Sequence, residues 1–469
     1  MMISTKKLSK TMEENVETVK SAFHETADLK ERSLLYNQTS CKLIYIDSLV
    51  DKKLIERNVI EPLLDCKTEA PPELVVKNAE YKKSADLEVT LKSLLEGSCA
   101  LFTEGENTVL LLPAAAGEDR AIQEPENEHI IKGAHDGFSE NVNKNIFLLR
   151  RRVKNPSLRV KTFSLGSNTN TNVSLLYIDD LVDRGPLDVL LKRIEAVDVQ
   201  ELQSAGELEE LIEDNSYSLF PQMLSTERPD RAVSYLLEGK SVLIVDGTPH
   251  VLISPITFFS FYQSPDDYNS RWVVGSFFRL IRIFSFLMAL SLPAIYIAVV
   301  SFHSEVLPLG ILYAIRVQIE YIPLPPLVEA ITMQLVLELL KEAAIRLPSP
   351  IAQTIGIVGG LVIGTAVVEA GFVSNTMIVV IALTAIASFV APVNQMGTGA
   401  RIMTFPIILA ANFFGFLGIV LALTVLLIHL CKLESFGKPY LEPVAPIHIK
   451  GIKDSFIKAK KKNNALKQT

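Results

Sequence analysis

The chain has 469 residues, which is too long for one compact domain, so two or three structural units are expected. Its formal net charge of -7 is unevenly distributed, because most acidic residues precede Trp272 and the long uncharged runs follow it. This segregation favours a membrane protein with a soluble N-terminal half, and nothing in the pattern indicates nucleic-acid binding.

The cysteines and the N-terminus bear on the compartment. The cysteines have neither a C-x-x-C spacing nor a metal-ligand pattern, and free thiols in a reducing compartment are expected for Cys41, Cys66, Cys99 and Cys431. Residues 1–20 are polar and lack the apolar core of a signal peptide. The N-terminal half is therefore expected to stay in the cytoplasm.

Two motifs recur in the same order within the first 270 residues. Tyr45-Ile46-Asp47-Ser48-Leu49-Val50-Asp51 returns as Tyr177-Ile178-Asp179-Asp180-Leu181-Val182-Asp183, and Leu94-Leu95-Glu96-Gly97 returns as Leu236-Leu237-Glu238-Gly239. After each second motif come an apolar strand, a turn (Glu104-Gly105 or Asp246-Gly247) and another apolar run. The repeat predicts two related α/β subdomains, over residues 1–160 and 161–270.

The aspartates of the repeated motif have a structural explanation. Asp47 and Asp179 are predicted to cap a helix after a strand, with Asp51 and Asp183 in its first turn. No phosphate-binding loop, dinucleotide motif or metal-spaced histidine set is present in the sequence. We therefore expect no catalytic residues, no metal, no cofactor and no enzymatic activity.

A basic segment separates the two repeats. Residues 137–160 contain Arg150, Arg151, Arg152 and Lys154, followed by an Asn-Pro pair. The pattern predicts a solvated helix and a connector between the subdomains, and a patch for anionic lipid is the alternative.

Four largely uncharged runs in residues 271–431 are long enough to be considered as membrane spans, over about 283–302, 351–373, 376–393 and 402–431. A charge at the centre of a spanning helix costs about 2.5–3.5 kcal/mol on insertion scales. Arginines precede the first span, and the tail of residues 432–469 is rich in lysine. By the positive-inside rule, both ends are predicted to be cytoplasmic, which agrees with four crossings.

Residues 303–350 carry several charges among apolar residues and are not expected to form a clean span. An amphipathic helix is predicted over about 327–347, lying at the membrane interface or re-entering it. Its polar face consists of Gln334, Glu338, Lys341 and Glu342, and its opposite face of Met333, Val336, Leu340 and Ala343.

The second predicted span has two distinct faces. Gly356, Gly360 and Gly364 recur at every fourth residue and predict close helix packing. The opposite face is the candidate lining of an ion path in a ring of subunits, formed by Val358, Val362, Thr365 and Glu369. Two alternatives remain for this helix: Glu369 as a solvated end at headgroup level, and helix packing without a pore.

Several stretches resemble one known family. They are residues 237–247 (LEGKSVLIVDG), 263–268 (QSPDDY), 279–282 (RLIR), 348–356 (PSPIAQTIG) and 368–371 (VEAG). Together with the YID motifs, they resemble the A subunit of spore germinant receptors, the GerA family, over nearly the whole chain.

The resemblance implies a receptor in the inner membrane of an endospore, where nutrient binding starts germination. It implies a permease-like B subunit that binds the nutrient and a C-subunit lipoprotein as partners. It also implies self-association into an ion-releasing channel, with five subunits as the expectation. The alternatives are a secondary transporter, and a non-conducting sensor or scaffold.

Overall fold

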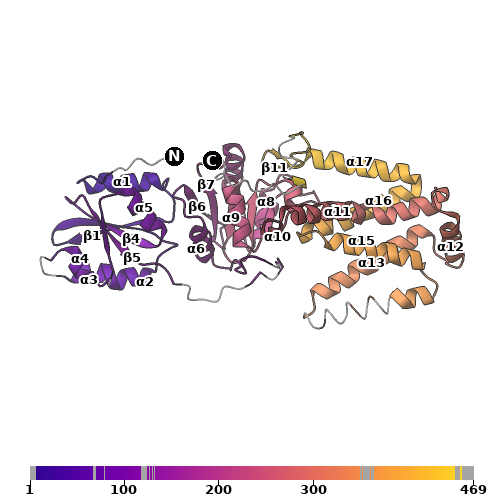
Figure 1. Cartoon of the computed structure of the whole chain (residues 1–469), viewed down its shortest axis with the longest axis horizontal. Coiled ribbons are helices and arrows are strands. Elements are labelled where there is room, and N and C mark those ends of the chain that lie inside the picture. The colour runs from indigo at the N-terminus through magenta and orange to yellow at the C-terminus, as the bar shows by residue number, and fades with distance from the viewer. Residues whose placement is uncertain are drawn as a thin grey trace, which may run out of the picture. The chain divides into compact units, whose positions relative to one another are not determined.

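The computed structural model (Figure 1) divides the chain into two compact units. The N-terminal unit contains Met1–Ser216, Gln222–Ile256 and Ser435–Lys438, and the helical unit contains Tyr217–Pro221, Thr257–Glu434 and Pro439–Thr469. The structure describes residues 7–66, 70–78, 80–117, 124–125, 127–128, 130, 132–348, 351, 357, 360, 364–448 and 455–456.

The first subdomain of the N-terminal unit is a five-stranded antiparallel sheet in the order β1-β2-β4-β5-β3. Its strands are β1 (Leu29–Tyr36), β2 (Thr39–Ile46), β3 (Lys82–Ser84), β4 (Ser98–Thr103) and β5 (Val109–Pro113). Figure 1 shows helices on both sides of this sheet. One face packs against α1 (Met12–Ala22) and α5 (Leu87–Leu95). The other packs against α2 (Lys52–Ile55), η1 (Glu56–Ile60), α3 (Glu61–Asp65) and α4 (Pro72–Val75).

The second subdomain repeats this topology, with the sheet order β6-β7-β9-β10-β8. Its strands are β6 (Leu158–Leu165), β7 (Thr171–Ile178), β8 (Leu224–Thr226), β9 (Ser241–Val245) and β10 (Val251–Ser254). The helices α6 (Val142–Arg152) and α9 (Pro229–Leu237) pack against one another and against β7 and β9. The apolar cluster on the sheet includes residues of α7 (Arg184–Glu195) and α8 (Ala205–Ile212).

The duplication extends further than the sequence motifs. Asn15 in α1 accepts a hydrogen bond from the Ser9 amide and donates one to the Ser9 carbonyl, and Asn145 in α6 does the same with Ser139. The predicted fold of two related α/β subdomains is confirmed. Because α6 is the counterpart of α1, the second subdomain begins near residue 138, and the predicted boundary at 161 was too late.

The predicted helix caps lie one turn later than expected. Asp51 and Asp183 are the N-cap residues of α2 and α7, and their carboxylates accept backbone N–H groups. Asp47 instead pairs with Lys52, and Asp179 pairs with arginines of β6 and α7. The capping role assigned to Asp47 and Asp179 was therefore wrong, because the chain turns once more between each strand and its helix.

The helical unit is built around α11 (Trp272–Ser301), which packs against several other helices. Among the described residues, α11 alone is a helix both long and apolar enough to cross a membrane, whereas α15 and α17 are apolar but shorter. Other described elements after β10 are η2 (Phe258–Tyr262), α10 (Pro265–Asn269), η3 (Ser304–Val306), α12 (Leu309–Glu320), α13 (Pro326–Ile345), α15 (Asn375–Phe389), α16 (Asn394–Phe414), α17 (Phe416–Lys432), β11 (Glu434–Ser435) and β12 (Lys438–Pro439).

The structure differs from the predicted last span, residues 402–431. The helix breaks at Gly415, whose φ of 59° and ψ of -137° are readily accessible only to glycine. α16 and α17 then pack against each other, so closely that a Cβ on Gly418 would lie 1.9 Å from the Ala410 carbonyl oxygen. A single tilted helix over this range is therefore replaced by a helical hairpin.

Candidate functional site

The predicted pore face lies largely outside the described residues, which include neither Val358, Val362 nor Gly356. Residues 364–369 are helical, and both Thr365 and Glu369 are exposed. A Cβ at Gly360 or Gly364 would meet no described atom within 4 Å. Pore lining and helix packing by these two faces therefore stay predictions.

A buried carboxylate joins α13 to the start of α15. Glu329 is 1% exposed, and its Oε1 accepts hydrogen bonds from the Ser374 amide at 2.5 Å and from the Ser374 hydroxyl at 2.6 Å. The Ser374 hydroxyl in turn accepts the Met377 amide as the N-cap of α15. The carboxylate thus satisfies backbone and side-chain donors at a helix start, where anions are favoured.

A second polar contact joins α13 to α16. The Arg401 Nε donates to Glu338 Oε1 at 2.6 Å, and its other nitrogens contact the Ser388 hydroxyl at 3.4 Å and the Thr398 hydroxyl at 3.0 Å. Arg401 is buried, and its guanidinium lies 5.8 Å from the centre of the Phe389 ring. Because an isolated charge is costly in an apolar interior, the pair fixes α13 against α16.

Helix α13 buries some polar groups and exposes some large apolar ones. Gln334 is 1% exposed and neither of its side-chain polar atoms has a hydrogen-bond partner in the described part of the chain, whereas Leu335 is 53% and Leu339 62% exposed. The four residues of the predicted polar face thus do not share one environment. Gln334 is buried, Glu338 and Lys341 are partly buried, and Glu342 is exposed and paired with Arg346.

The QSPDDY motif has a structural role that sequence analysis missed. Ser264 and Asp267 form a capping box on α10. The buried Asp267 also accepts a hydrogen bond from Arg279 at 3.2 Å and one from Arg282 at 2.6 Å, both through Oδ2. These arginines, which the sequence pattern marked as topology signals and as part of a family-like stretch, therefore hold the turn against the first half of α11. The sequence signal for this contact was the pair of arginines three residues apart, on one helix face, that follows Asp266-Asp267.

Aromatic rings surround this turn within the helical unit. The Phe258 ring centroid lies 5.2 Å from that of Tyr262 and 5.3 Å from that of Phe286, in tilted and edge-on arrangements. The Phe258 amide also donates to the Tyr440 carbonyl at 2.8 Å. The first half of α11 is thus held by an ionic contact and an aromatic cluster together.

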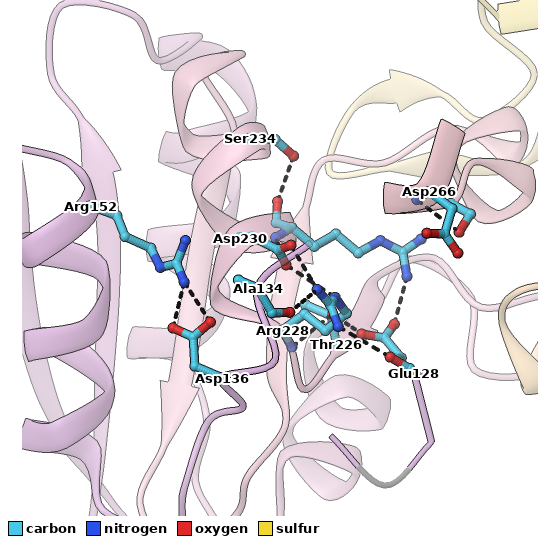
Figure 2. Close-up of polar contacts among 11 residues, drawn as sticks. Glu128, Ala134, Asp136, Arg152, Thr226, Arg228, Asp230, Ser234 and Asp266 are labelled. Atoms are coloured by element: carbon cyan, nitrogen blue, oxygen red, sulfur yellow. Dashed lines mark hydrogen bonds and ion pairs between the residues drawn. The ribbon is translucent and has the colours of Figure 1, made fainter. Parts of the chain in front are cut away.

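In the N-terminal unit, charged groups hold the segment that precedes the second subdomain and includes Glu128 and Ala134, as Figure 2 shows. This segment is here called the connector. Glu128 pairs with Arg231 of α9 at 2.6 Å and accepts a hydrogen bond from the Thr226 hydroxyl. The buried Arg228 donates to the Ala134 carbonyl at 2.8 Å and pairs with Asp230. These groups pair with one another, so the network positions the connector and has no arrangement of nucleophile and base.

Within the described ranges, no group of three or more His, Cys, Asp or Glu side chains is placed to hold a metal ion. All four cysteines are reduced thiols and not disulfides, and burial raises the pKa of Cys99 to about 12. A thiol with so high a pKa is a poor nucleophile at neutral pH, because the thiolate is the reactive form.

Comparison with known proteins covers almost the whole chain. Spore germination protein KA of Bacillus subtilis is 37% identical over 96% of this chain and 85% of its own length. Spore germination protein GerLA of Bacillus cereus is 36% identical, covering 92% of this chain and 89% of its own. The uncharacterized membrane protein YfkQ of B. subtilis is 37% identical, covering 96% and 90%.

A solved structure also matches, the N-terminal domain of the A subunit of the Bacillus megaterium spore germinant receptor GerK3. It is 25% identical with a TM-score of 0.42, over 54% of this chain and 98% of that domain. The family described as Bacillus/Clostridium GerA spore germination protein matches residues 17–468. The chain therefore belongs to the GerA family of spore germination proteins.

Proposed function

We propose that this chain is the A subunit of a nutrient-sensing spore germinant receptor and forms an oligomeric ion channel that opens when the nutrient is sensed. The proposed setting is the spore inner membrane, with both termini cytoplasmic. The proposed partners are a permease-like, nutrient-binding B subunit and a C-subunit lipoprotein. Five copies of the chain are proposed to form the ring.

The observation that carries the membrane part of this proposal is the distribution of side chains in the helical unit. Glu329, Gln334 and Arg401 are buried, whereas large apolar side chains are exposed on several helices, including Phe277, Phe284, Leu339, Phe413, Leu417 and Val425. A soluble helix bundle has the opposite distribution, and exposed apolar area of this kind marks a membrane or protein contact. Hydrocarbon around the unit supplies the environment that the exposed side chains require.

The ion path is proposed to run along the face of Val358, Val362, Thr365 and Glu369. In a ring, the valines would form an apolar constriction and the carboxylates would attract cations. Nutrient binding to the B subunit opens the channel only if the nutrient binds the open arrangement more tightly than the closed one. The glycine face, residues 356, 360 and 364, is proposed to pack against a neighbouring helix.

Planar-bilayer conductance of the purified full chain tests the constriction. Val362→Ala is expected to conduct without nutrient, because a smaller side chain widens and wets the narrow point. Val425→Ala on the exposed face of α17 is the matched control and should behave as wild type. Equal conductance of wild type and Val362→Ala would remove Val362 from the constriction.

Reversal potentials in asymmetric potassium chloride test the carboxylate. Glu369→Gln is expected to lower cation preference, since it removes one negative charge per subunit from the path. Glu342→Gln, at an exposed carboxylate paired with Arg346, is the control. If reversal potentials stay the same in Glu369→Gln, the carboxylate does not face the ions.

A further inference from the structure

A four-residue segment after α17, Ser435–Lys438, belongs to the N-terminal unit. Between β11 and β12, Phe436 and Gly437 form a two-residue turn with φ values of 52° and 82°. Turns with two positive φ values favour Asn, Asp and Gly, and a bulky side chain is disfavoured there. Phenylalanine at this position therefore indicates that its ring is needed for a contact outside the turn.

The Phe436 ring completes the apolar core of the second subdomain. It is 0% exposed and clusters with Leu208, Ile212, Met223 and Leu252. The corresponding cluster of the first subdomain draws all its residues from positions 34–114. Of these two clusters, as the described residues define them, the one in the second subdomain thus includes a core side chain from a distant part of the chain.

Polar contacts hold the backbone on both sides of this ring. The Phe436 amide donates to Asp214 Oδ2 at 2.7 Å, while Asp214 Oδ1 is held by Arg193 at 2.6 Å. The Arg193 guanidinium also lies 5.1 Å from the centre of the Phe436 ring. The amide is therefore bound by a carboxylate that is itself positioned, which favours one fixed geometry.

The two ends of the segment are also bound. The Ser435 hydroxyl donates to the Gln222 carbonyl at 2.8 Å and accepts the Ile256 amide at 3.0 Å. At the other end, Lys438 pairs with Asp183, the N-cap of α7, at 3.0 Å. Residues 435–438 thus contact the N-cap of α7, the segment between α8 and β8, and the loop after β10.

We propose that residues 435–438, here called the C-terminal anchor, are an internal ligand of the second subdomain and couple it to helix α17. The helix ends at Lys432, three residues before Ser435. Three residues of extended chain reach at most about 10 Å, so little slack separates the anchor from the helix. A rearrangement around α8 that shifts the anchor therefore also moves the last turn of α17. The inference concerns coupling within one chain and goes beyond ion conduction.

Hydrogen exchange of the full-length protein in detergent, resolved by peptide mass spectrometry, tests the coupling. Phe436→Ala is expected to speed exchange by about tenfold or more at residues 206–223 and, together with them, at residues 426–433. Phe413→Ala, at an exposed ring of α16, is the matched control and should alter neither region. Phe436→Leu keeps an apolar side chain and should give a smaller rise in both.

An insertion distinguishes two effects: binding of the anchor to the second subdomain, and transmission of that binding to α17. Six Gly and Ser residues between Leu433 and Glu434 should leave residues 206–223 protected, while Phe436→Ala added to this insertion should no longer affect residues 426–433. Acceleration confined to residues 206–223 in Phe436→Ala without the insertion would overturn the coupling. Unchanged exchange in both regions would overturn the anchor itself. Neither readout depends on conductance, so the result is independent of whether the protein is a channel.

Discussion

Arg150, at the end of α6, and Asp28, directly before β1, form a buried ion pair between the two subdomains. The Arg150 Nε lies 2.9 Å from Asp28 Oδ2, and its Nη2 lies 2.7 Å from Oδ1. Thr26 donates to the same carboxylate at 2.7 Å and accepts the Val160 amide at 2.9 Å. The Asp28 carboxylate and the Thr26 hydroxyl thus both contact the second repeat. Arg150 is buried and belongs to no solvated basic patch.

Removing this carboxylate's charge should weaken the joint. Asp28→Asn leaves Arg150 buried without its counter-ion and is expected to cost about 3–5 kcal/mol of unfolding free energy. The matched control is Arg32→Ala, which breaks an exposed pair with Glu56 and should cost less than about 1 kcal/mol. Urea unfolding of the full chain in detergent measures both. If the two variants lose similar amounts of unfolding free energy, the buried pair does not contribute more to stability than the exposed one.

The same pair predicts that the protein loses folding stability at low pH. Burial acts to raise the pKa of Asp28, but the charge of Arg150 and hydrogen bonds from Arg150, Thr26 and Ser48 outweigh it, so the pKa is lowered. Stability from Asp28 is then present above the unfolded pKa of about 3.9 and is lost as pH falls through the lower folded value. Asp28→Asn should remove this part of the pH dependence.

Glu213, next to Asp214, is predicted to destabilise the second subdomain as pH rises. Burial, with repulsion from Glu210 and Asp214, raises the pKa of Glu213 to about 7. The stability it contributes is full below its unfolded pKa of about 4.3 and is lost as pH rises through 7. Glu213→Gln should flatten the melting temperature between pH 5 and 8, whereas Glu104→Gln, at an exposed turn, should not. A wild-type melting temperature that rises across this range would contradict the assignment.

Gly418 should not accept a side chain. Alanine is the better helix former by about 1 kcal/mol. At Gly418, however, its Cβ would lie 1.9 Å from the Ala410 backbone oxygen, and such overpacking costs typically about 1–3 kcal/mol. Gly418→Ala is therefore expected to lower the melting temperature in detergent. Gly310→Ala in α12 meets open space and should be neutral or stabilising. An equal effect at both glycines would argue against the close approach of α16 and α17.

The Glu338–Arg401 pair should contribute more to folding stability than the exposed Glu342–Arg346 pair on α13. Glu338→Gln leaves a buried guanidinium without its carboxylate and is expected to cost about 3–5 kcal/mol. Glu342→Gln breaks an exposed pair one turn away, worth about 0.3–0.5 kcal/mol. Thermal unfolding in detergent compares them, and Arg401→Gln combined with Glu338→Gln should recover part of the loss. A double variant no better than the single ones would show that the two charges do not interact.

Much of the fold was predictable because it rests on local or repeated patterns. The YID and LEG motifs identified the duplication, since two copies of one unit repeat the same strands and turns at similar spacing. The helical half followed from its uncharged runs. The boundary at 161 and the last span were wrong because α6 has no motif and because Gly415, a single residue, decides where a helix reverses.

By itself, then, the sequence determined the two α/β subdomains and the helical unit after them, because hydrophobic period and turn residues act over a few neighbouring positions. Only the tertiary structure decided which charges meet and which rings are buried. Arg150 reaches Asp28 across 122 residues, and Phe436 reaches Asp214 across 222. Such partners are determined by packing and by the free-energy cost of burying an unpaired group. The spacing of neighbouring residues in the sequence reveals neither of these two factors.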